Sequence, residues 1–305
     1  MRKQLCEALV SRSKSPSMIF LTGDLGFMAL EDLRDSLGDR FINAGVAEQN
    51  MMSIAAAMSK QKLEVWVYSI APFCYARPFE QIRNDICFHD LPVKIIGNGG
   101  GYGYGVMGPT HHAIEDYGVL LTLPMMSAYV PVFDEDLYEV ISKVGADLHP
   151  TYLRLGRGDS PKDFHVPEYA AWRQLTSGQG KVVLAVGPIA GSYITSFNQL
   201  PDSVRPNFWA VAELPISQNP PPKKLQDQIN RETELIAIEE HVSQGGFGSQ
   251  LALYMLNHTM RPKSFTHFYA KSHTFNHYGS QAFLRQQSSL DVETVLAAVI
   301  SPKST

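Results

Sequence analysis

The chain has 305 residues, of which 44% are apolar and 18% are charged, and its formal net charge is −4. This balance is typical of a folded protein with room for about two domains, and it excludes a disordered chain. The small negative charge provides no basic field for nucleic acid or anionic lipid. No run of about 18 apolar residues is present, which excludes a membrane-spanning helix.

The N-terminal segment and the cysteines together favour a cytoplasmic protein. Charged residues interrupt the start of the chain too often for a secretory signal. Cys6, Cys74 and Cys87 form an odd, sparse set without CxxC spacing. We therefore expect reduced thiols that are buried as small apolar side chains, rather than a disulfide or zinc framework.

Apolar, β-rich runs alternate with helical patterns along the first half of the chain. We predict strands over residues 18–21, 65–69, 93–97, 127–130 and 151–155, and helices over residues 48–59, 76–88, 113–123 and 134–144. Strands without a polar face are typical of a parallel sheet that is covered on both sides by helices.

The segment 158–180 is polar and is broken by prolines and glycines, which predicts a linker with an ordered arm and no strand. The alternation then restarts, with predicted strands over residues 182–186, 208–211, 235–238 and 264–268. The sequence therefore predicts an α/β fold of two doubly wound domains, residues 1–170 and 171–305. Each is expected to be a mostly parallel sheet with helices on both faces.

Residues 97–112 form a glycine-rich loop that contains one GxGxxG match, at Gly103, Gly105 and Gly108. A dinucleotide site needs these glycines in the turn between a strand and a helix. The predicted strand ends well before the match and Pro109 follows it, so the match is best explained by chance. A loop at the carboxyl end of a strand is still a suitable place for a ligand.

His111 and His112 end this loop, and Glu115 and Asp116 follow them. Adjacent histidines point in different directions at the start of a helix, and no third convergent ligand is visible, so we predict no metal site. A loop histidine that acts on a substrate is favoured, because imidazole can donate or accept a proton near neutral pH. The histidines of the C-terminal half are expected at the surface or at an interface: His241, His267, His273 and His277.

Glu48 lies in the first turn of the predicted helix over residues 48–59. An acid in that turn complements the helix dipole, which by itself is a sufficient structural explanation. The helix, however, is apolar on most sides, through Ala47, Met51, Met52, Ile54, Ala55, Ala56 and Ala57. A carboxyl group directed into such surroundings needs a polar partner or stays protonated, and it is suited to hydrogen-bond a ring nitrogen.

Several stretches together resemble one family, the transketolase-like thiamine-diphosphate enzymes. They are GVAEQNM at residues 45–51, FEQIRN at 79–84, GPTHHAIEDYGVLLTLPMM at 108–126, YLRLGR at 152–157 and LIAIEEHVSQGGFGSQL at 235–251. The resemblance covers nearly the whole chain in the right order. It implies a pyrimidine-binding domain followed by the smaller C-terminal domain of this family.

The family's first domain, which binds diphosphate and metal through GDG and a downstream Asn pair, is missing. Residues 22–26 read TGDLG, and Asn43 is wrongly spaced for the second motif. The chain therefore resembles the C-terminal subunit of a split transketolase. The resemblance implies thiamine diphosphate as cofactor, Mg²⁺ bound mainly by an N-terminal partner subunit, and a heterotetramer.

The resemblance also implies roles for single residues at the cofactor. Glu48 matches the glutamate that hydrogen-bonds the aminopyrimidine ring and activates the cofactor. Phe73 matches the residue that stacks on the pyrimidine, and Ile70 stands where relatives often have an aromatic wall. His111 matches the histidine near the thiazolium, which polarises a substrate carbonyl or hydroxyl.

Departures from the family's pattern concern the substrate. Sugar-using transketolases usually read GEDGPTH, whereas this chain reads GVMGPTH, so Val106 and Met107 replace both acids. Arg157 fits a phosphate-binding arginine, and Arg2 matches another. The resemblance therefore implies substrate contacts at His111, Met107, Arg157 and Arg2. It disfavours ordinary pentose phosphates and favours a modified, less hydroxylated or nucleotide-linked sugar derivative.

The leading hypothesis is a transferase that moves a ketol or acyl unit between carbonyl substrates, sugar-derived ones above all. Two alternatives stay open. The first is a decarboxylating relative, similar to deoxyxylulose-phosphate synthase or to the beta subunit of a 2-oxoacid dehydrogenase. The second is a non-catalytic assembly subunit that keeps the fold.

Overall fold

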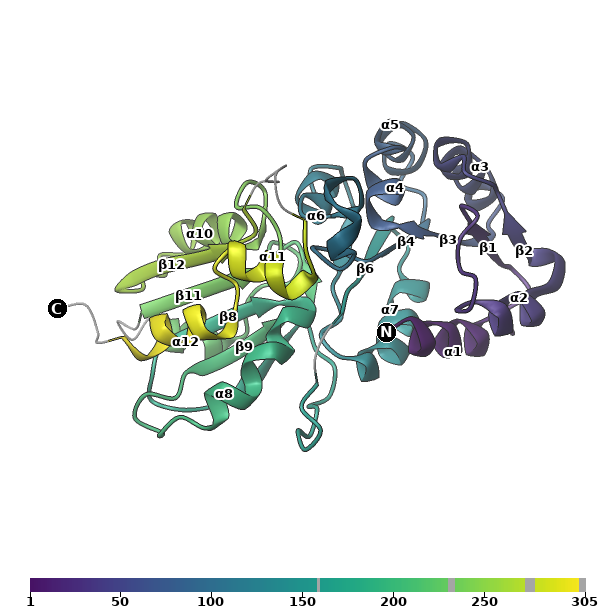
Figure 1. Ribbon diagram of the computed structural model, residues 1–305. Coiled ribbons are helices and arrows are strands. Elements are labelled where there is room, and N and C mark those ends of the chain that lie inside the picture. Colours follow the sequence, from purple (N-terminus) through teal and green to yellow (C-terminus); the bar gives the residue numbers. More distant parts are fainter. Residues whose placement is uncertain (158–159, 230–233, 272–277, 302–305) are drawn as a thin grey trace.

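The protein contains two sheets, of seven and five strands, in a computed structural model that describes residues 1–157, 160–229, 234–271 and 278–301. Figure 1 shows the two sheets side by side, the N-terminal half on the right and the C-terminal half on the left. Helices surround both sheets, which confirms the predicted α/β class.

The first sheet has the strand order β10-β5-β6-β4-β3-β1-β2. All its neighbouring pairs are parallel except β10 with β5. The strands are β1 (Met18–Thr22), β2 (Phe41–Asn43), β3 (Glu64–Ile70), β4 (Lys94–Asn98), β5 (Ser127–Tyr129), β6 (Thr151–Leu155) and β10 (Glu213–Leu214).

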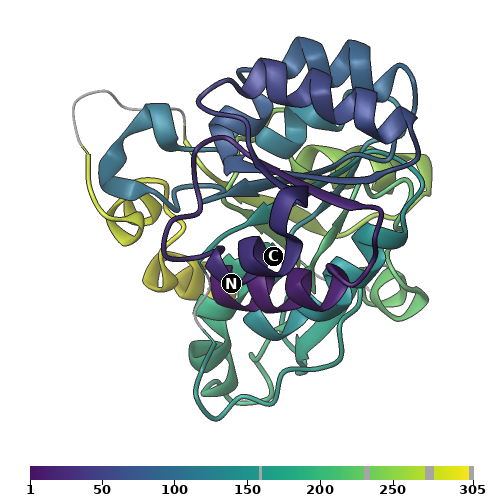
Figure 2. The same cartoon turned by 90° about the vertical axis from the view of Figure 1, so that its right-hand side faces the viewer.

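Helices cover both faces of this sheet (Figures 1 and 2). One face carries α1 (Arg2–Arg12), α2 (Glu31–Leu37) and α7 (Leu137–Ala146), and the other carries α3 (Glu48–Lys60), α4 (Ala71–Tyr75) and α5 (Phe79–Gln81). Leu5 and Leu9 of α1 belong to the same buried cluster as Trp66 of β3. Met51 of α3 lies in the cluster on the opposite face, with Val67 of β3.

The second sheet has the order β12-β11-β8-β9-β7, and only the pair β7 with β9 is antiparallel. Its strands are β7 (Trp172–Thr176), β8 (Val182–Val186), β9 (Asn207–Val211), β11 (Glu234–Glu239) and β12 (Ser264–Tyr269). The helices around it are α8 (Ile194–Asn198), α9 (Lys223–Ile229), α10 (Phe247–Asn257), α11 (Gln281–Gln287) and α12 (Val292–Ile300). Apolar clusters fill both faces, and the cluster under α10 continues into the first half.

Nine strands were predicted within one or two residues, whereas β2, β7 and β10 were missed. β7 lies inside the segment predicted as a linker without a strand, so that prediction is wrong. β7 pairs only with β9, at the edge of the sheet, and its sequence WRQLT includes the polar residue Arg173, which is buried in an ion pair with Asp136. β2 and β10, of three and two residues, are too short to show a periodic pattern.

Three predicted helices differ from the structure. The helix predicted over residues 134–144 begins as a 3₁₀ turn (Asp134–Asp136) before α7. The helix predicted over residues 76–88 is divided into α5 and a π-helical segment (Ile82–Cys87), and Pro78 precedes α5 because it lacks an N–H to continue a helix. The helix predicted over residues 113–123 shortens to α6 (Asp116–Leu120). Ala113 instead pairs with Gly101 in an antiparallel bridge.

All three cysteines are buried and free, as predicted. Burial raises the pKa of the Cys74 thiol, whose Sγ lies 3.2 Å from the Ile96 carbonyl oxygen. Within the described part of the chain, no helix combines the length and the apolar composition needed to cross a bilayer.

Candidate active site

The predicted site residues gather at the carboxyl edge of the first sheet. β1, β3 and β4 are neighbouring parallel strands, so their carboxyl ends lie at one edge. Gly23 follows β1, Ile70 ends β3, and Asn98 ends β4. The α3 helix begins at the same edge, after β2.

Glu48 is the first residue of α3, and only 4% of it is exposed. It lies beside Gly23 and Ser69: a Cβ on Gly23 would be 3.5 Å from Glu48 Cγ and 3.4 Å from Ser69 Oγ. The Ser69 hydroxyl is buried and has no hydrogen-bond partner among the described residues. Glu48 is therefore buried beside an unsatisfied polar group.

The α3 helix is less enclosed than its composition predicts. Met51 and Met52 are fully buried, but Ala47 and Ala57 are exposed. We expected this helix to be buried on most sides, and that expectation is wrong at Ala47 and Ala57. Val46, just before the helix, is also 72% exposed.

The partner of Glu48 is Arg77, which the sequence analysis missed. Arg77 Nη1 donates to both carboxylate oxygens of Glu48, at 3.2 and 3.1 Å. The Arg77 guanidinium carbon also lies 3.8 Å from the centre of the Phe73 ring. Arg77 follows α4, and its side chain is 47% exposed.

His111 lies beside Phe73. The two ring centres are 5.2 Å apart in an edge-on arrangement. His111 ends a short 3₁₀ turn (Pro109–His111), and its Nδ1 lies 2.9 Å from the Thr110 hydroxyl. The structure thus links Glu48, Arg77, Phe73 and His111 in one continuous cluster, which we call the Glu48–His111 site.

Tyr104 is a second residue that the sequence analysis missed. Its ring centre is 6.1 Å from that of His111, and its hydroxyl accepts a hydrogen bond of 2.7 Å from Asn98. Burial raises the pKa of Tyr104, while the Asn98 hydrogen bond and the positive charges of Arg2 and Arg157 oppose that rise. The position of an aromatic residue inside a glycine-rich loop is the sequence signal that could have identified Tyr104.

Arg2 and Arg157 are therefore close enough to Tyr104 for their charges to act on it. Arg2 is the first residue of α1, and Arg157 follows β6. Both residues are exposed. The two arginines are more than 150 positions apart in the sequence, and the sheet brings them to the same edge.

Ile70 and Met107 occupy less enclosed positions around the site. Ile70 is half-buried and directly follows Ser69. Met107 is 55% exposed in a 3₁₀ turn (Gly105–Met107), next to Val106, which is 72% exposed. A Cβ on Gly108 would lie 3.0 Å from the Tyr278 ring, so the C-terminal half also reaches this loop.

The glycine-rich loop does not have the geometry of a dinucleotide motif. Gly105 and Gly108 have φ angles of 32° and 81°; Gly105 begins the first of two successive 3₁₀ turns, and Gly108 separates the two. The helix that follows Gly108 directly has three residues. The loop therefore offers no extended helix N-terminus to a pyrophosphate, in agreement with a chance match.

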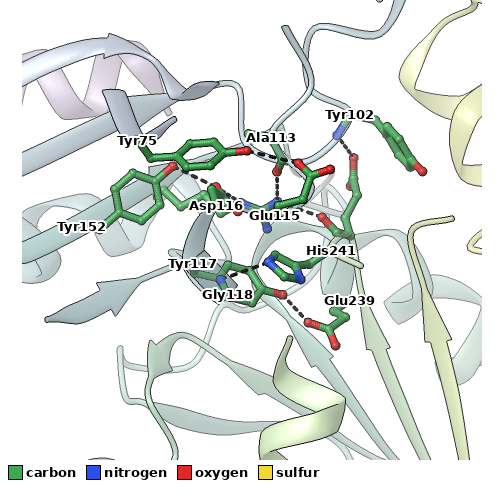
Figure 3. Close-up of polar contacts among 12 residues, drawn as sticks. Tyr75, Tyr102, Ala113, Glu115, Asp116, Tyr117, Gly118, Tyr152, Glu239 and His241 are labelled. Atoms are coloured by element: carbon green, nitrogen blue, oxygen red, sulfur yellow. Dashed lines mark hydrogen bonds and ion pairs between the residues drawn. The ribbon is translucent and has the colours of Figure 1, made fainter. Parts of the chain in front are cut away.

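The residues after His111 belong to a buried joint between the two halves (Figure 3). Tyr117 stacks on His241 with ring centres 4.0 Å apart, and the Gly118 N–H donates to His241 Nε2 at 3.1 Å. His241 is fully buried, so it lies at an interface inside the chain and not at the surface. His273 and His277 lie outside the described residues.

Glu239 anchors the other side of this joint. It accepts hydrogen bonds from the Tyr117 hydroxyl and from the Phe247 and Gly248 N–H groups, the last two at 2.7 and 2.8 Å. Its carboxylate also lies 2.7 Å from His267 Nε2. Burial alone would raise the pKa of Glu239, but the His267 hydrogen bond and the His241 and His267 charges lower it overall. A carboxylate at the start of α10 also complements the helix dipole.

The acidic residues beside the histidine pair are engaged in structural contacts. Glu115 accepts a hydrogen bond of 3.1 Å from Tyr75, and Asp116 accepts one of 2.8 Å from Tyr152. His112 Nε2 lies 2.8 Å from the Gly105 carbonyl oxygen. Among the described residues, no group of three or more His, Cys, Asp or Glu side chains is arranged to hold a metal ion.

Comparison with known proteins identifies the family. The transketolase pyrimidine-binding domain matches residues 3–162, more than half of the chain. The chain belongs to the transketolase pyrimidine-binding family. This finding confirms the resemblance that the GVAEQNM and GPTHH stretches indicate.

The transketolase-like chain is similar to two curated relatives and to one solved structure. One of the subunits of apulose-4-phosphate transketolase from Phocaeicola vulgatus is 25% identical, with 81% of each chain covered. 1-Deoxy-D-xylulose-5-phosphate synthase from Clostridium perfringens is 25% identical over 89% of this chain, which spans only 44% of that enzyme. A solved structure described as "split gene transketolase, inactive beta4 tetramer" has a TM-score of 0.81 at 26% identity, covering 98% of this chain and 96% of that one.

Proposed function

We propose that this transketolase-like chain is the C-terminal subunit of a two-chain, thiamine-diphosphate-dependent transferase. It moves a ketol or acyl unit between carbonyl substrates, sugar-derived ones above all. The observation that carries the proposal is the Glu48–His111 site, where a buried carboxylate, a half-buried aromatic ring and an imidazole meet at the carboxyl edge of a parallel sheet.

The residues of the site fit the pyrimidine part of the cofactor. Glu48 would hold a ring nitrogen, and the unpaired Ser69 hydroxyl is a second polar group beside Gly23. The Phe73 ring offers a flat apolar surface, and Ile70 would add an apolar wall. When bound, thiamine diphosphate supplies the carbon nucleophile and stabilises the electron pair left by carbon–carbon cleavage.

His111 is proposed to act on the substrate. Its ring lies 5.2 Å from Phe73 and therefore borders the space where the cofactor's reactive part would lie. An imidazole there can donate a proton to a substrate oxygen or accept one from it. Met107, Arg157 and Arg2 are proposed to contact the rest of the substrate, with the arginines toward any anionic group.

The diphosphate and Mg²⁺ are proposed to be bound mainly by an N-terminal partner subunit. Two observations support this division. The first is that the apulose-4-phosphate transketolase relative is itself named as one subunit of an enzyme, and the second is that this chain spans less than half of the synthase. We also propose that the assembled enzyme is a heterotetramer and that it is cytoplasmic. Within this chain, the proposed domains are residues 1–170 and 171–305.

The requirement for a partner gives a direct test. We expect the purified chain alone to bind thiamine diphosphate with Mg²⁺ only weakly, because most of the cofactor's charge lies in its diphosphate. Isothermal titration calorimetry should show micromolar affinity only after the partner subunit is added. Micromolar binding by this chain alone would contradict the two-chain proposal.

The stacking role of Phe73 gives a second prediction. Phe73→Ala should weaken thiamine diphosphate binding to the assembled pair by about 1–3 kcal/mol, because apolar contact area is lost. Phe88→Ala is a matched control, because Phe88 is 79% exposed at the end of the neighbouring helical segment. Equal dissociation constants for the wild type and Phe73→Ala would remove Phe73 from the site.

A decarboxylating reaction is the second candidate function. It is supported by the 1-deoxy-D-xylulose-5-phosphate synthase relative and by the loss of both acids at Val106 and Met107. Incubation of both subunits with pyruvate separates the two reactions, because only the decarboxylating enzyme releases carbon dioxide. Turnover of ketose substrates without carbon dioxide release would favour the transferase.

A further inference from the structure

The position of Arg77 in the Glu48–His111 site is unusual for a half-exposed arginine. Its Nη1 reaches both oxygens of a carboxylate that is only 4% exposed, at 3.2 and 3.1 Å. Its guanidinium carbon is 3.8 Å from the Phe73 ring centre, which is the stacking distance of a cation over an aromatic face. A single planar group therefore contacts both residues proposed for the pyrimidine.

The guanidinium and the aminopyrimidine make the same demands on this chain. Both are flat, and both combine stacking on an aromatic ring with a hydrogen bond to the Glu48 carboxyl group, which accepts from the guanidinium and would share its proton with the ring nitrogen. The space over the Phe73 ring is filled when the guanidinium is at 3.8 Å, and both Glu48 oxygens are engaged by the same nitrogen. The two groups cannot occupy that position together.

We propose that Arg77 occupies the pyrimidine subsite before the cofactor binds and must leave it for Glu48 to meet the ring nitrogen. The inference rests on the proposed function. Arg77 thereby acts as a positioning residue that holds the buried carboxylate and the Phe73 ring in place. It also competes with the cofactor for both.

The contacts of Arg77 are suited to reversible displacement. Its side chain is 47% exposed, so the guanidinium can be hydrated as soon as it leaves Glu48. It lies in the connection between two short helices, α4 and α5, where rotation of one side chain disturbs no long helix. Half-exposed ion pairs and cation–π contacts are each weak compared with a fully buried ion pair.

The test is calorimetric titration of thiamine diphosphate and Mg²⁺ into the assembled pair. Arg77→Ala should bind the cofactor about tenfold more tightly than the wild type, because the competitor is removed, and Arg77→Gln should also bind it more tightly, because its side chain cannot stack on Phe73 as a cation. Arg77→Gln can still hydrogen-bond Glu48, so this variant does not leave a buried carboxylate without a partner. It therefore remains informative if Arg77→Ala fails to fold. Arg77→Lys keeps the charge but lacks the planar stacking group, and it should fall between the wild type and Arg77→Ala.

Arg83→Ala provides the matched control, because Arg83 is an exposed arginine of the adjacent π-helical segment. It should leave the affinity unchanged. A purely structural role for Arg77 predicts that Arg77→Ala and Arg77→Gln bind the cofactor more weakly than the wild type. That result, or an unchanged affinity in these two variants, would overturn the inference.

The same titration keeps this inference separate from the proposed function. If Glu48→Gln and Phe73→Ala weaken binding while the Arg77 variants do not strengthen it, the pyrimidine site stands and only the competition fails. If Glu48→Gln and Phe73→Ala leave the affinity unchanged, the proposed function fails, and the role of Arg77 fails with it.

Discussion

Glu48→Gln should lower the turnover rate of the assembled pair by roughly 10²- to 10⁴-fold, the range in which positioned proton-transfer groups contribute. The amide keeps the size of the side chain but cannot share a proton with a ring nitrogen in the same way. Glu48 is buried beside Gly23 and Ser69, so solvent cannot replace it easily. Steady-state kinetics with saturating cofactor is the measurement.

Glu293→Gln is the matched control for this substitution. Glu293 is also an acid in the first turn of a helix, α12, but it is exposed and lies in the C-terminal half. It should keep wild-type turnover. Full activity of Glu48→Gln would exclude both enzymatic hypotheses for this residue and would leave the assembly role.

Arg154→Met should lower the free energy of unfolding of the chain by about 3–5 kcal/mol, the effect of breaking a buried ion pair. Arg154 Nε lies 2.9 Å from Asp116 Oδ2, and Asp116 is fully buried. Arg154 Nη2 also donates to the carbonyl oxygens of Ala113 and Glu240, both at 2.8 Å. The substitution therefore removes a link between the two halves as well as a charge, and urea unfolding measures the loss.

Two further variants separate the charge from the packing. Arg154→Met combined with Asp116→Asn should recover part of the loss, because no unpaired carboxylate is then buried. Arg34→Met should change the stability by less than about 1 kcal/mol, because the Arg34–Asp35 pair is exposed. A small effect of Arg154→Met alone would show that the joint does not depend on this pair.

The parts of the fold that depend on apolar burial could be predicted from the sequence. The strands 18–22, 64–70 and 182–186 consist almost wholly of buried residues, so their composition alone marks them. The sequence patterns of β7 and α6 predicted their structure less well. β7 carries the buried polar residues Arg173 and Thr176, and α6 is shortened because Ala113 bonds to the glycine-rich loop.

The candidate site could be predicted in part. Glu48, Phe73 and His111 were found through local motifs, and the structure places them together. Arg77 was missed because its ion-pair partner Glu48 lies 29 positions earlier in the sequence, and Tyr104 was missed because its place in the site is shown by the contact of its ring with His111. The burial of His241 was missed for the same reason, since its stacking partner Tyr117 lies 124 positions earlier.

The strand β10 ties the two halves together more closely than a flexible connection would. It leaves the second sheet after β9 and completes the outer edge of the first, where Glu213 pairs with Tyr129 of β5 and its carboxylate meets Lys143 of α7. A chain cut near residue 170 would therefore expose the backbone of β5 as an open edge, which invites pairing with other chains. During synthesis, the N-terminal sheet stays unfinished until residue 214 has left the ribosome.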